Sequence, residues 1–309
     1  MRQIKHPKDF GRVAVAMGGA SAEREISLLS GQRVWRALER LGVEAVAVDI
    51  GDRPLQALWG QGFDRVFNIV HGRGGEDGVL QGLLEAMRLP YTGSGVLGSA
   101  LSMDKLATKL CWRGAGLPTP AWYVLETAAD LTPCAETLGF PVIVKPALEG
   151  SSIGTNKASD LRELAWAWEE AKRYRCPVFA ECWVDGDEYT AALLKDEILP
   201  LIRLETPRTF YDFEAKYRAT STRYLCPCGL PADEEQRLKE LAKRACQVLG
   251  VTGWGRVDLF LDHQGAPWLI EVNTVPGMTD HSLVPMAARA AGIEFDELVW
   301  QILETSVEV

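Results

Sequence analysis

Short hydrophobic runs alternate with longer amphipathic segments along the first third of the 309-residue chain. The runs suit strands, and the longer segments carry apolar side chains at helical spacing, as at Leu28, Val34 and Leu38. Strands and helices are expected in the order 12–17, 26–41, 44–49, 65–70 and 79–87. This strand–loop–helix order predicts a parallel sheet with crossover helices, and we place this α/β domain at residues 1–102.

The rest of the chain predicts two smaller α+β domains, at residues 103–187 and 188–309. In the first of them, helices and strands are expected at 105–115, 140–145, 161–174 and 178–184. The second opens with strands and closes with helices at 234–249 and 283–303. Between them, segment 210–221 has the composition of a flexible loop.

Two short strands near the end of the chain flank a predicted turn at Asp262–Gly265. Because side chains alternate along a strand, Arg256 and Asp258 share one face of the first strand, and Glu271 and Asn273 share one face of the second. The turn is expected to place Arg256 opposite Glu271, on the same side of the sheet. The apolar residues are expected on the other face, in a core: Val257, Leu259, Leu261, Trp268, Ile270 and Val272.

The polar face of these two strands predicts a ligand site. Carboxylates are costly to bury without a counter-charge, so such a cluster favours a bound cation. Hard oxygen ligands suit magnesium. We therefore expect Asp258, Glu271 and Asn273 to bind a metal or a phosphate group, with Arg256 beside them.

Composition narrows the class of protein. The chain is 47% hydrophobic and carries a net charge of −9 with no basic tract, which argues against nucleic acid as a partner. It has no apolar run long enough to span a membrane and no secretory signal at its start. Seven scattered cysteines suit reduced thiols in a cytoplasm, and the pair Cys226 and Cys228 is a poor zinc candidate that suits packing better.

Two lysines and a loop in the middle domain are compatible with phosphate. Lys145 ends an apolar strand and Lys105 opens a helix, although a strand lysine can also snorkel and a helix lysine can be solvated. The small residues of Glu149–Gly154 would let backbone N–H groups hold phosphate oxygens. The loop lacks a Walker A ending, and an ordinary glycine turn is the alternative.

Other polar residues follow strands. Glu181 lies on a strand whose edge could present backbone groups to adenine, and Glu188 could bind ribose hydroxyls, although a plain polar turn is the alternative. The loop at 18–23 precedes a helix and suits an anion, whereas Glu23 itself favours an ammonium group. His71 opens a second glycine-rich loop at the same sheet edge, where open α/β sheets bind ligands, but a structural role is the commoner one for such a histidine.

Together these segments resemble the ATP-grasp ligases, and most closely the D-alanine–D-alanine ligase family, from about Val13 to Leu303. The segments that carry the resemblance occur in the order of the family: Gly18–Glu25, His71–Gly78, Met103–Lys105, Val144–Pro146, Glu149–Ser152, Tyr211–Tyr217, Gly253–Arg256 and Glu271–Met278. The resemblance implies an ATP-grasp fold, in which a Rossmann-like domain with a parallel sheet precedes two α+β domains that enclose ATP.

The resemblance also implies an activity, the ATP-dependent joining of two D-alanines through a D-alanyl phosphate for peptidoglycan synthesis. The implied ATP ligands are Lys105, Lys145, Glu181, Trp183, Glu188 and Lys216. Two magnesium ions, with manganese as a substitute, would be held by Asp258, Glu271 and Asn273. The implied catalytic and substrate-binding residues are Glu23, Ser151, Tyr217, Arg256, Gly277 and Ser282.

Within this set, Glu23 would bind the ammonium group of the first D-alanine, and Ser282 the carboxylate of the second. Arg256 and the Gly277 N–H would stabilise the oxyanion, and Ser151 and Tyr217 would link a lid to Glu23. The tyrosine favours an amine as second substrate, with D-serine and D-lactate as alternatives. A homodimer through the first domain is also implied.

Two residues depart from the family pattern. Val275 stands where a serine or leucine is expected, and Asp280 where a serine is common. Asp280 adds an anion near Ser282, which is expected to lower affinity for the second substrate. A regulatory ATP-binding protein without chemistry would need a broken metal or oxyanion set, and here both sets are complete.

Overall fold

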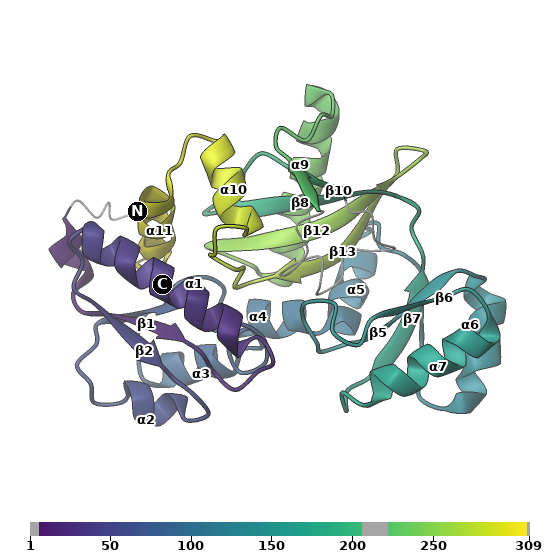
Figure 1. Cartoon of the computed structure of the whole chain (residues 1–309), viewed down its shortest axis with the longest axis horizontal. Helices are drawn as coiled ribbons and strands as arrows, with labels where there is room; N and C mark the ends of the chain where they lie inside the picture. Colours follow the sequence, from purple (N-terminus) through teal and green to yellow (C-terminus); the bar gives the residue numbers. More distant parts are fainter. Residues whose placement is uncertain (1–5, 206–221, 308–309) are drawn as a thin grey trace.

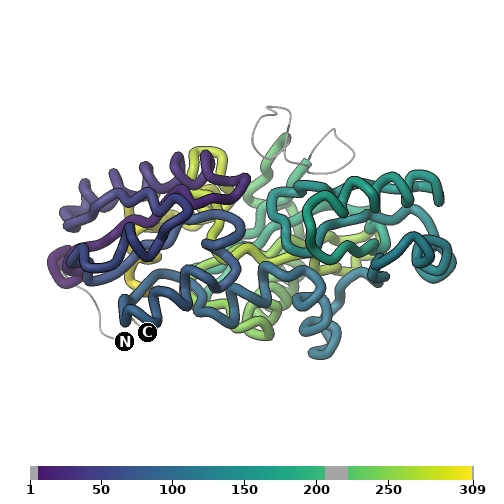
Figure 2. The backbone as a smooth tube through the Cα atoms, turned by 90° about the horizontal axis from the view of Figure 1, so that it is seen from below, coloured from purple at the N-terminus to yellow at the C-terminus, as the bar shows by residue number. Residues whose placement is uncertain are grey.

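The computed structural model describes residues 6–205 and 222–307, which form three sheets (Figure 1). The first sheet is parallel with strand order β2-β1-β3, and the second is antiparallel with order β4-β7-β5-β6. The third has six antiparallel strands, in the order β11-β10-β8-β12-β13 with β9 paired to β8. In Figures 1 and 2 the third sheet lies between the other two.

The first sheet is built as the hydrophobic pattern predicts. Its central strand is buried along its whole length, which explains the unbroken apolar run in the sequence. Its elements are a short 3₁₀ helix at Pro7–Phe10, β1 (Val13–Met17), α1 (Arg24–Arg40), β2 (Ala45–Asp49), α2 (Pro54–Leu58), β3 (Arg65–Asn68) and α3 (Val79–Ala86). The first domain is therefore the predicted α/β unit with a parallel sheet.

The middle of the chain forms two linking helices and then the second sheet. The helices α6 and α7 pack on this sheet around a core of their own (Figure 1). The elements are α4 (Val96–Met103), α5 (Lys105–Gly114), β4 (Trp122–Val124), a 3₁₀ turn at Ala128–Asp130, α6 (Leu131–Leu138), β5 (Val142–Pro146), β6 (Asn156–Ala158), α7 (Leu161–Lys172) and β7 (Val178–Cys182).

The third sheet has two different faces. One face packs on α9 in an apolar core, and the other carries the polar residues of β12 and β13. The elements are β8 (Gly186–Leu194), β9 (Glu197–Ile198), β10 (Ile202–Glu205), β11 (Arg223–Leu225), α9 (Ala232–Leu249), β12 (Trp254–Asp262), β13 (Pro267–Asn273), α10 (Leu283–Ala290), α11 (Phe295–Glu304) and a 3₁₀ turn at Thr305–Val307.

The predicted pairing of the closing strands is wrong by two residues. Arg256 pairs with Asn273 rather than with Glu271, and Asp258 pairs with Glu271. The register then shifts between Asp258 and Leu259, so that Leu259 faces Leu269. A β-bulge of this kind adds a residue to one strand, and it is not visible in an alternating sequence pattern.

The bulge also corrects the predicted core. Ile270 is the additional residue, and beyond it the faces of β13 are exchanged, so Leu269 instead of Ile270 lies in the core against α9. Trp268 pairs with Phe260 on the polar side and donates from its indole nitrogen to Asp262 at 2.9 Å. Val257, Leu259, Leu261 and Val272 lie in the core as expected.

The C-terminal helix predicted at 283–303 is two helices. The chain breaks at Gly292, whose φ of 80° is a left-handed conformation that ends α10 before α11 begins. The helices α4 and α6 were not predicted, because each is short and follows a segment without a clear helical pattern. The predicted loop at 210–221 lies outside the described residues.

Within the described ranges, no helix is long and apolar enough to cross a membrane.

Because α4 packs closely on the end of α9, alanine substitutions at two glycines are expected to change the free energy of unfolding differently. A Cβ on the buried Gly98 would overlap the carbonyl of Gly250, whereas a Cβ on Gly114 at the end of α5 would meet nothing within 4 Å. Gly98→Ala is therefore expected to lower the free energy of unfolding by about 1–3 kcal/mol. Gly114→Ala, the matched control, is expected to change it by about 1 kcal/mol or less, in the stabilising direction.

Urea denaturation of both variants and the parent measures these differences. An unchanged midpoint for Gly98→Ala would show that α4 can move away from α9 at no cost.

Candidate active site

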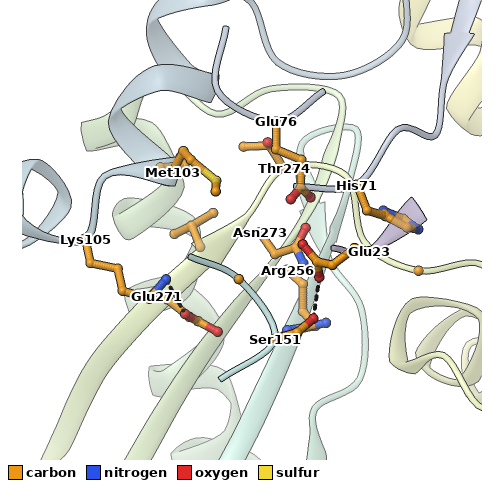
Figure 3. Close-up of a pocket in the computed structure, with 14 residues that line it drawn as sticks. Glu23, His71, Glu76, Met103, Lys105, Ser151, Arg256, Glu271, Asn273 and Thr274 are labelled. Carbon is orange, nitrogen blue, oxygen red and sulfur yellow. Dashed lines mark hydrogen bonds and ion pairs between the residues drawn. The ribbon is translucent and has the colours of Figure 1, made fainter. Parts of the chain in front are cut away.

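Two cavities adjoin where the three sheets meet. The first, here called the central cavity, is drawn in Figure 3 and is lined by Glu23, His71, Glu76, Ser102, Met103, Lys105, Gly150, Ser151, Arg256, Glu271, Val272, Asn273, Thr274 and Gly277. The second, the adjoining cavity, is lined by Lys105, Ile143, Lys145, Ser152, Thr155, Glu181, Cys182, Trp183, Val184, Glu188, Asp258, Phe260, Ile270 and Glu271. Lys105 and Glu271 belong to both, so the cavities share a wall.

Arg256 and Asp258 form a forked ion pair on β12. The Arg256 Nε and Nη2 atoms donate to the two Asp258 oxygens at 2.8 and 2.6 Å. Thr190, on the neighbouring strand β8, donates from its hydroxyl to Asp258 Oδ1 at 2.7 Å. These three hydrogen bonds satisfy a carboxylate that is only 8% exposed.

Lys105 stands opposite Glu271 at the shared wall (Figure 3). Its Nζ lies 3.2 Å from Glu271 Oε2 and donates to the Glu149 carbonyl at 2.7 Å. Lys105 is the first residue of α5, and the side chain of Asp104 caps this helix by accepting from two backbone N–H groups. The cap fixes the helix start and thereby the direction of the lysine.

The donor set on β12 and β13 fits a hard cation. Asp258 and Glu271 are direct cross-strand partners. Asn273 lies two residues further along β13, opposite Arg256, and its Oδ1 accepts from the Val275 N–H at 3.1 Å. Two carboxylates and one amide oxygen are ligands that magnesium accepts. In the described parts of the chain, no group of three or more His, Cys, Asp and Glu side chains is arranged to hold a metal ion.

Glu23 lies under the glycine–serine loop of residues 149–154. The Ser151 hydroxyl donates to Glu23 Oε1, and a Cβ on Gly150 would lie 2.9 Å from the other oxygen, Oε2. Ser151 and Ser152 have φ angles of 52° and 58°, a left-handed conformation that side chains rarely adopt. The loop is therefore bent tightly over a carboxylate. A carboxylate at this position favours a bound ammonium group over a bound anion.

His71 serves as a buried structural hydrogen-bonder. Its Nδ1 lies 2.8 Å from the Val275 carbonyl, and its Nε2 lies 3.3 Å from the Ser30 hydroxyl. Burial lowers the pKa of His71, against the opposing effect of Glu23, so the ring is neutral near neutral pH. The ring thus ties β3's loop to the segment that follows β13.

Glu76 is a site residue that the sequence analysis did not single out. Burial, and next the nearby charge of Glu23, raise the pKa of Glu76 to about 8, although the Gly72 N–H donates to its carboxyl group at 2.8 Å. The signal available in the sequence was a carboxylate inside the glycine-rich loop 71–78, at the carboxyl end of a parallel strand.

Gly277 and Ser282 are neighbours in the loop between β13 and α10. A Cβ on Gly277 would lie 2.9 Å from the Ser282 hydroxyl oxygen, which also accepts from the Thr279 N–H at 2.9 Å. The Met278 N–H donates to the Ser30 hydroxyl of α1 at 3.1 Å. The first domain therefore helps to hold this loop against the central cavity.

Asp280 does not stand as an unbalanced anion beside Ser282. It forms an ion pair with Arg33 of α1, and hydrogen bonding to that guanidinium holds the pKa of Asp280 below its usual value. Arg33 also lies over the Phe295 ring at 5.0 Å. Pairing with Arg33 removes the reason for expecting Asp280 to weaken carboxylate binding.

The adjoining cavity combines apolar walls with charged ends. The bulge places Ile270 in its wall next to Phe260, and Ile143 of β5 faces them from the second sheet. Trp183 carries the Lys157 ammonium over its ring at 3.9 Å. A flat apolar group with a polar tail would find both kinds of contact here.

Glu181, predicted near adenine, has its carboxylate directed to two lysines instead of into open space. Lys145 donates to Glu181 Oε1, and the Lys109 Nζ lies 2.7 Å from Oε2. Burial raises the pKa of Glu181, but the two ammonium groups more than offset this and lower it overall. Lys109 was missed by sequence reasoning, since a lysine inside a helix usually lies in solvent.

The structure thus brings thirteen of the predicted residues to the two cavities or their rims: Glu23, Lys105, Lys145, Ser151, Glu181, Trp183, Glu188, Arg256, Asp258, Glu271, Asn273, Gly277 and Ser282. Lys216 and Tyr217 lie outside the described residues.

The chain is similar to known proteins over nearly its whole length. Residues 111–304 match the family model described as D-ala D-ala ligase C-terminus, and residues 53–94 match D-ala D-ala ligase N-terminus. The chain is 64% identical over 305 residues to a D-alanine–D-alanine ligase of Methylococcus capsulatus, covering 99% of both chains. It is 59% identical over 301 residues to one of Nitrosococcus oceani, covering 97% of this chain and 95% of the other.

Solved structures resemble the fold over nearly its whole length. The D-alanine–D-alanine ligase of Bacillus anthracis complexed with ATP superposes with a TM-score of 0.84 at 33% identity, covering 96% of this chain and 97% of the other. A D-Ala:D-Ser ligase of Enterococcus faecalis superposes with a TM-score of 0.83 at 27% identity, covering 96% and 99%. The predicted α/β ATP-grasp fold is confirmed, and the chain belongs to the D-alanine–D-alanine ligase family.

Proposed function

We propose that this protein joins two D-alanines into D-alanyl-D-alanine at the expense of ATP, with release of ADP and phosphate, for peptidoglycan precursor synthesis. The observation that carries the proposal is the meeting of Glu23, Arg256 and Glu271 in the central cavity, beside the adjoining cavity, which is lined by Lys145 and Asp258. An ammonium acceptor, an oxyanion donor and a phosphate site are the parts that such a ligation requires. The 64% identity to a D-alanine–D-alanine ligase supports the same reaction.

ATP would occupy the adjoining cavity. The apolar walls made by Ile143, Phe260 and Ile270 suit the faces of an adenine ring. Trp183 and Glu188 would line the base and the ribose, and the lysines at positions 105 and 145 would bind the phosphates. The neighbouring structure of a ligase complexed with ATP supports this choice of nucleotide. Lys216 would also contact ATP.

Magnesium, or manganese in its place, would be held by Asp258, Glu271 and Asn273, and would neutralise phosphate charge. In the structure these carboxylates are balanced by Arg256 and Lys105. With a metal held there, the Arg256 guanidinium and the Lys105 ammonium group would be available to substrate oxygens. The chain's own cations are therefore already placed for the phosphoryl and acyl groups.

The amino-acid substrates would occupy the central cavity. Glu23 would accept hydrogen bonds from the ammonium group of the first D-alanine. The carboxylate of that D-alanine takes the γ-phosphoryl group of ATP, which gives an acyl phosphate and releases ADP. The amine of the second D-alanine then attacks the acyl carbon, and phosphate leaves from a tetrahedral intermediate. Arg256 and the Gly277 N–H would stabilise the oxyanion of that intermediate, and Ser282 would hold the second carboxylate. Ser151 and Tyr217 would close the site against water.

A D-alanine–D-serine ligase is the second candidate. A D-Ala:D-Ser ligase superposes on this chain nearly as well as the D-alanine–D-alanine ligases do, so the fold alone does not select the second substrate. Product analysis with D-alanine and D-serine distinguishes the two second substrates.

We also propose the three-domain division at 1–102, 103–187 and 188–309, a homodimer through the first domain and a cytoplasmic setting. Each sheet falls almost wholly within one range, since only β8 begins two residues before position 188.

Product analysis tests the proposed reaction. Incubation with ATP, magnesium and D-alanine is expected to release phosphate only when D-alanine is present and to yield D-alanyl-D-alanine, identified by mass spectrometry. L-Alanine serves as the matched control. Turnover with D-alanine plus D-serine, giving only the mixed product, would favour the second candidate, and no product with any amino acid would overturn both.

Glu271 offers a test of the metal site. Glu271→Gln removes one anionic ligand and is expected to lower kcat on the order of 10²-fold, because phosphate charge is then poorly neutralised. Glu304→Gln is the matched control, since Glu304 also pairs with a lysine, at 2.8 Å, and its side chain is 18% exposed against 20% for Glu271. Equal rates for the two variants would mean that the metal lies elsewhere.

Glu76 predicts a pH dependence of stability. Its pKa is raised from the ordinary 4.5 to about 8. Between these two pH values the folded state keeps a proton that the unfolded state has released. The stability gained from neutral Glu76 is complete below pH 4.5 and is lost as pH rises through about 8. Glu76→Gln, which stays neutral, is therefore expected to become progressively more stable relative to the parent from pH 5 to pH 8.

Thermal melting of both proteins across this range measures the effect. A constant difference in Tm would show that Glu76 does not change its protonation on folding.

A further inference from the structure

Lys109 is a fully buried charged side chain for which the reaction above has no use. It is 1% exposed and lies on α5, one helical turn after Lys105. Lys105 is directed to the shared wall of the cavities, whereas Lys109 is directed to Glu181 behind the adjoining cavity. A lysine is rarely buried unless something requires its charge.

The surroundings of Lys109 match an ammonium ion, although burial lowers the pKa of Lys109 from its ordinary value against the opposing effect of Glu181. Its Nζ lies 2.7 Å from Glu181 Oε2, 2.7 Å from Thr119 Oγ1 and 3.1 Å from the Pro120 carbonyl. The Thr119 hydroxyl donates its own hydrogen to the Leu269 carbonyl at 3.0 Å, so toward Lys109 it can only accept. All three partners are acceptors, and only the charged form of lysine has three N–H donors.

Glu181 is shared between two cations. Its Oε2 faces Lys109, and its Oε1 accepts from Lys145. Two ammonium groups and one carboxylate leave this cluster with a net positive charge of one. The Lys145 side chain is 11% exposed and lines the adjoining cavity, whereas that of Lys109 is sealed behind it, under the Trp122 ring at 5.3 Å. The surplus charge is therefore presented to the cavity by Lys145.

We propose that Lys109 is a positioning residue for the nucleotide: by balancing Glu181 from behind, it leaves Lys145 with a positive charge available to phosphate. The role presupposes the nucleotide site proposed above. Without Lys109, Glu181 and Lys145 would form a neutral pair, and the carboxylate would repel the phosphates that Lys145 attracts. Lys109 itself touches no substrate.

The test compares ATP with adenosine, which lacks the phosphates. Lys109→Met keeps the length of the side chain and removes its charge, and it leaves the Glu181–Lys145 pair intact, so no buried charge loses its last partner. In titration calorimetry without D-alanine, so that no ligation occurs, ATP affinity is expected to fall about tenfold while adenosine affinity stays within about twofold. The ratio of ATP to adenosine affinity is the readout.

Lys172→Met is the matched control. Lys172 also pairs with a glutamate, Glu169 at 3.1 Å, and also lies over a tryptophan ring, at 3.9 Å, but it is on the outer face of α7. Its ratio of affinities is expected to equal that of the parent.

A second variant separates charge from structure. In Lys109→Met/Glu181→Gln the buried carboxylate is gone as well, so Lys145 again carries an unpaired charge. The affinity ratio is expected to return toward the parent value, and any lost adenine contact of Glu181 cancels in the ratio. Thermal melting shows whether each variant is folded.

The outcomes are distinct. A parent protein that binds no ATP would overturn the proposed function itself. A parent that binds ATP, with an unchanged ratio in Lys109→Met, would overturn the role of Lys109. A ratio that falls in the single variant and stays equally low in the double variant would also overturn it, because a structural defect would then explain the loss.

Discussion

Buried carboxylates with an assigned counter-charge are the constraint on which the rest of this molecule depends. Asp258 is balanced by Arg256, Glu271 by Lys105, and Glu181 by two lysines. Removing such charges from water costs several kcal/mol each unless a partner is supplied. The partners of Glu271 and Glu181 come from other elements, α5 and β5, so the requirement for neutrality also fixes how these elements are assembled.

The same balance makes the two cavities compatible with both metal ions and polyanions. A site built for phosphates would repel itself if its cations had no partners, and a site built for metals would do so if its carboxylates had none. Placing both kinds of charge in contact satisfies each of them before ligands arrive. Glu76 avoids the cost in another way, by remaining protonated.

Much of this arrangement could be predicted from the sequence, and the failures have identifiable causes. Lys105 stood at the start of a helix and Asp258 on the polar face of a strand, where spacing and chemistry pointed to them. The bulge at Ile270 could not be foreseen, because one added residue leaves the composition of β13 unchanged while it exchanges the two faces. Lys109 was missed because nothing in a helical pattern distinguishes a buried lysine from a solvated one. The pairing of Asp280 with Arg33 joins elements that no local pattern connects.

The hydrogen bond between Ser151 and Glu23 joins residues 128 positions apart, and that between His71 and the Val275 carbonyl joins residues 204 apart. During synthesis, the active site is therefore incomplete until the last third of the chain has been made and has packed against the first third. Substrate then bridges the earliest and latest parts of the polypeptide at once. Ligand therefore binds only to molecules whose synthesis and folding are both complete. A saturating concentration of ligand would protect these molecules from proteolysis, whereas truncated chains would stay exposed to it.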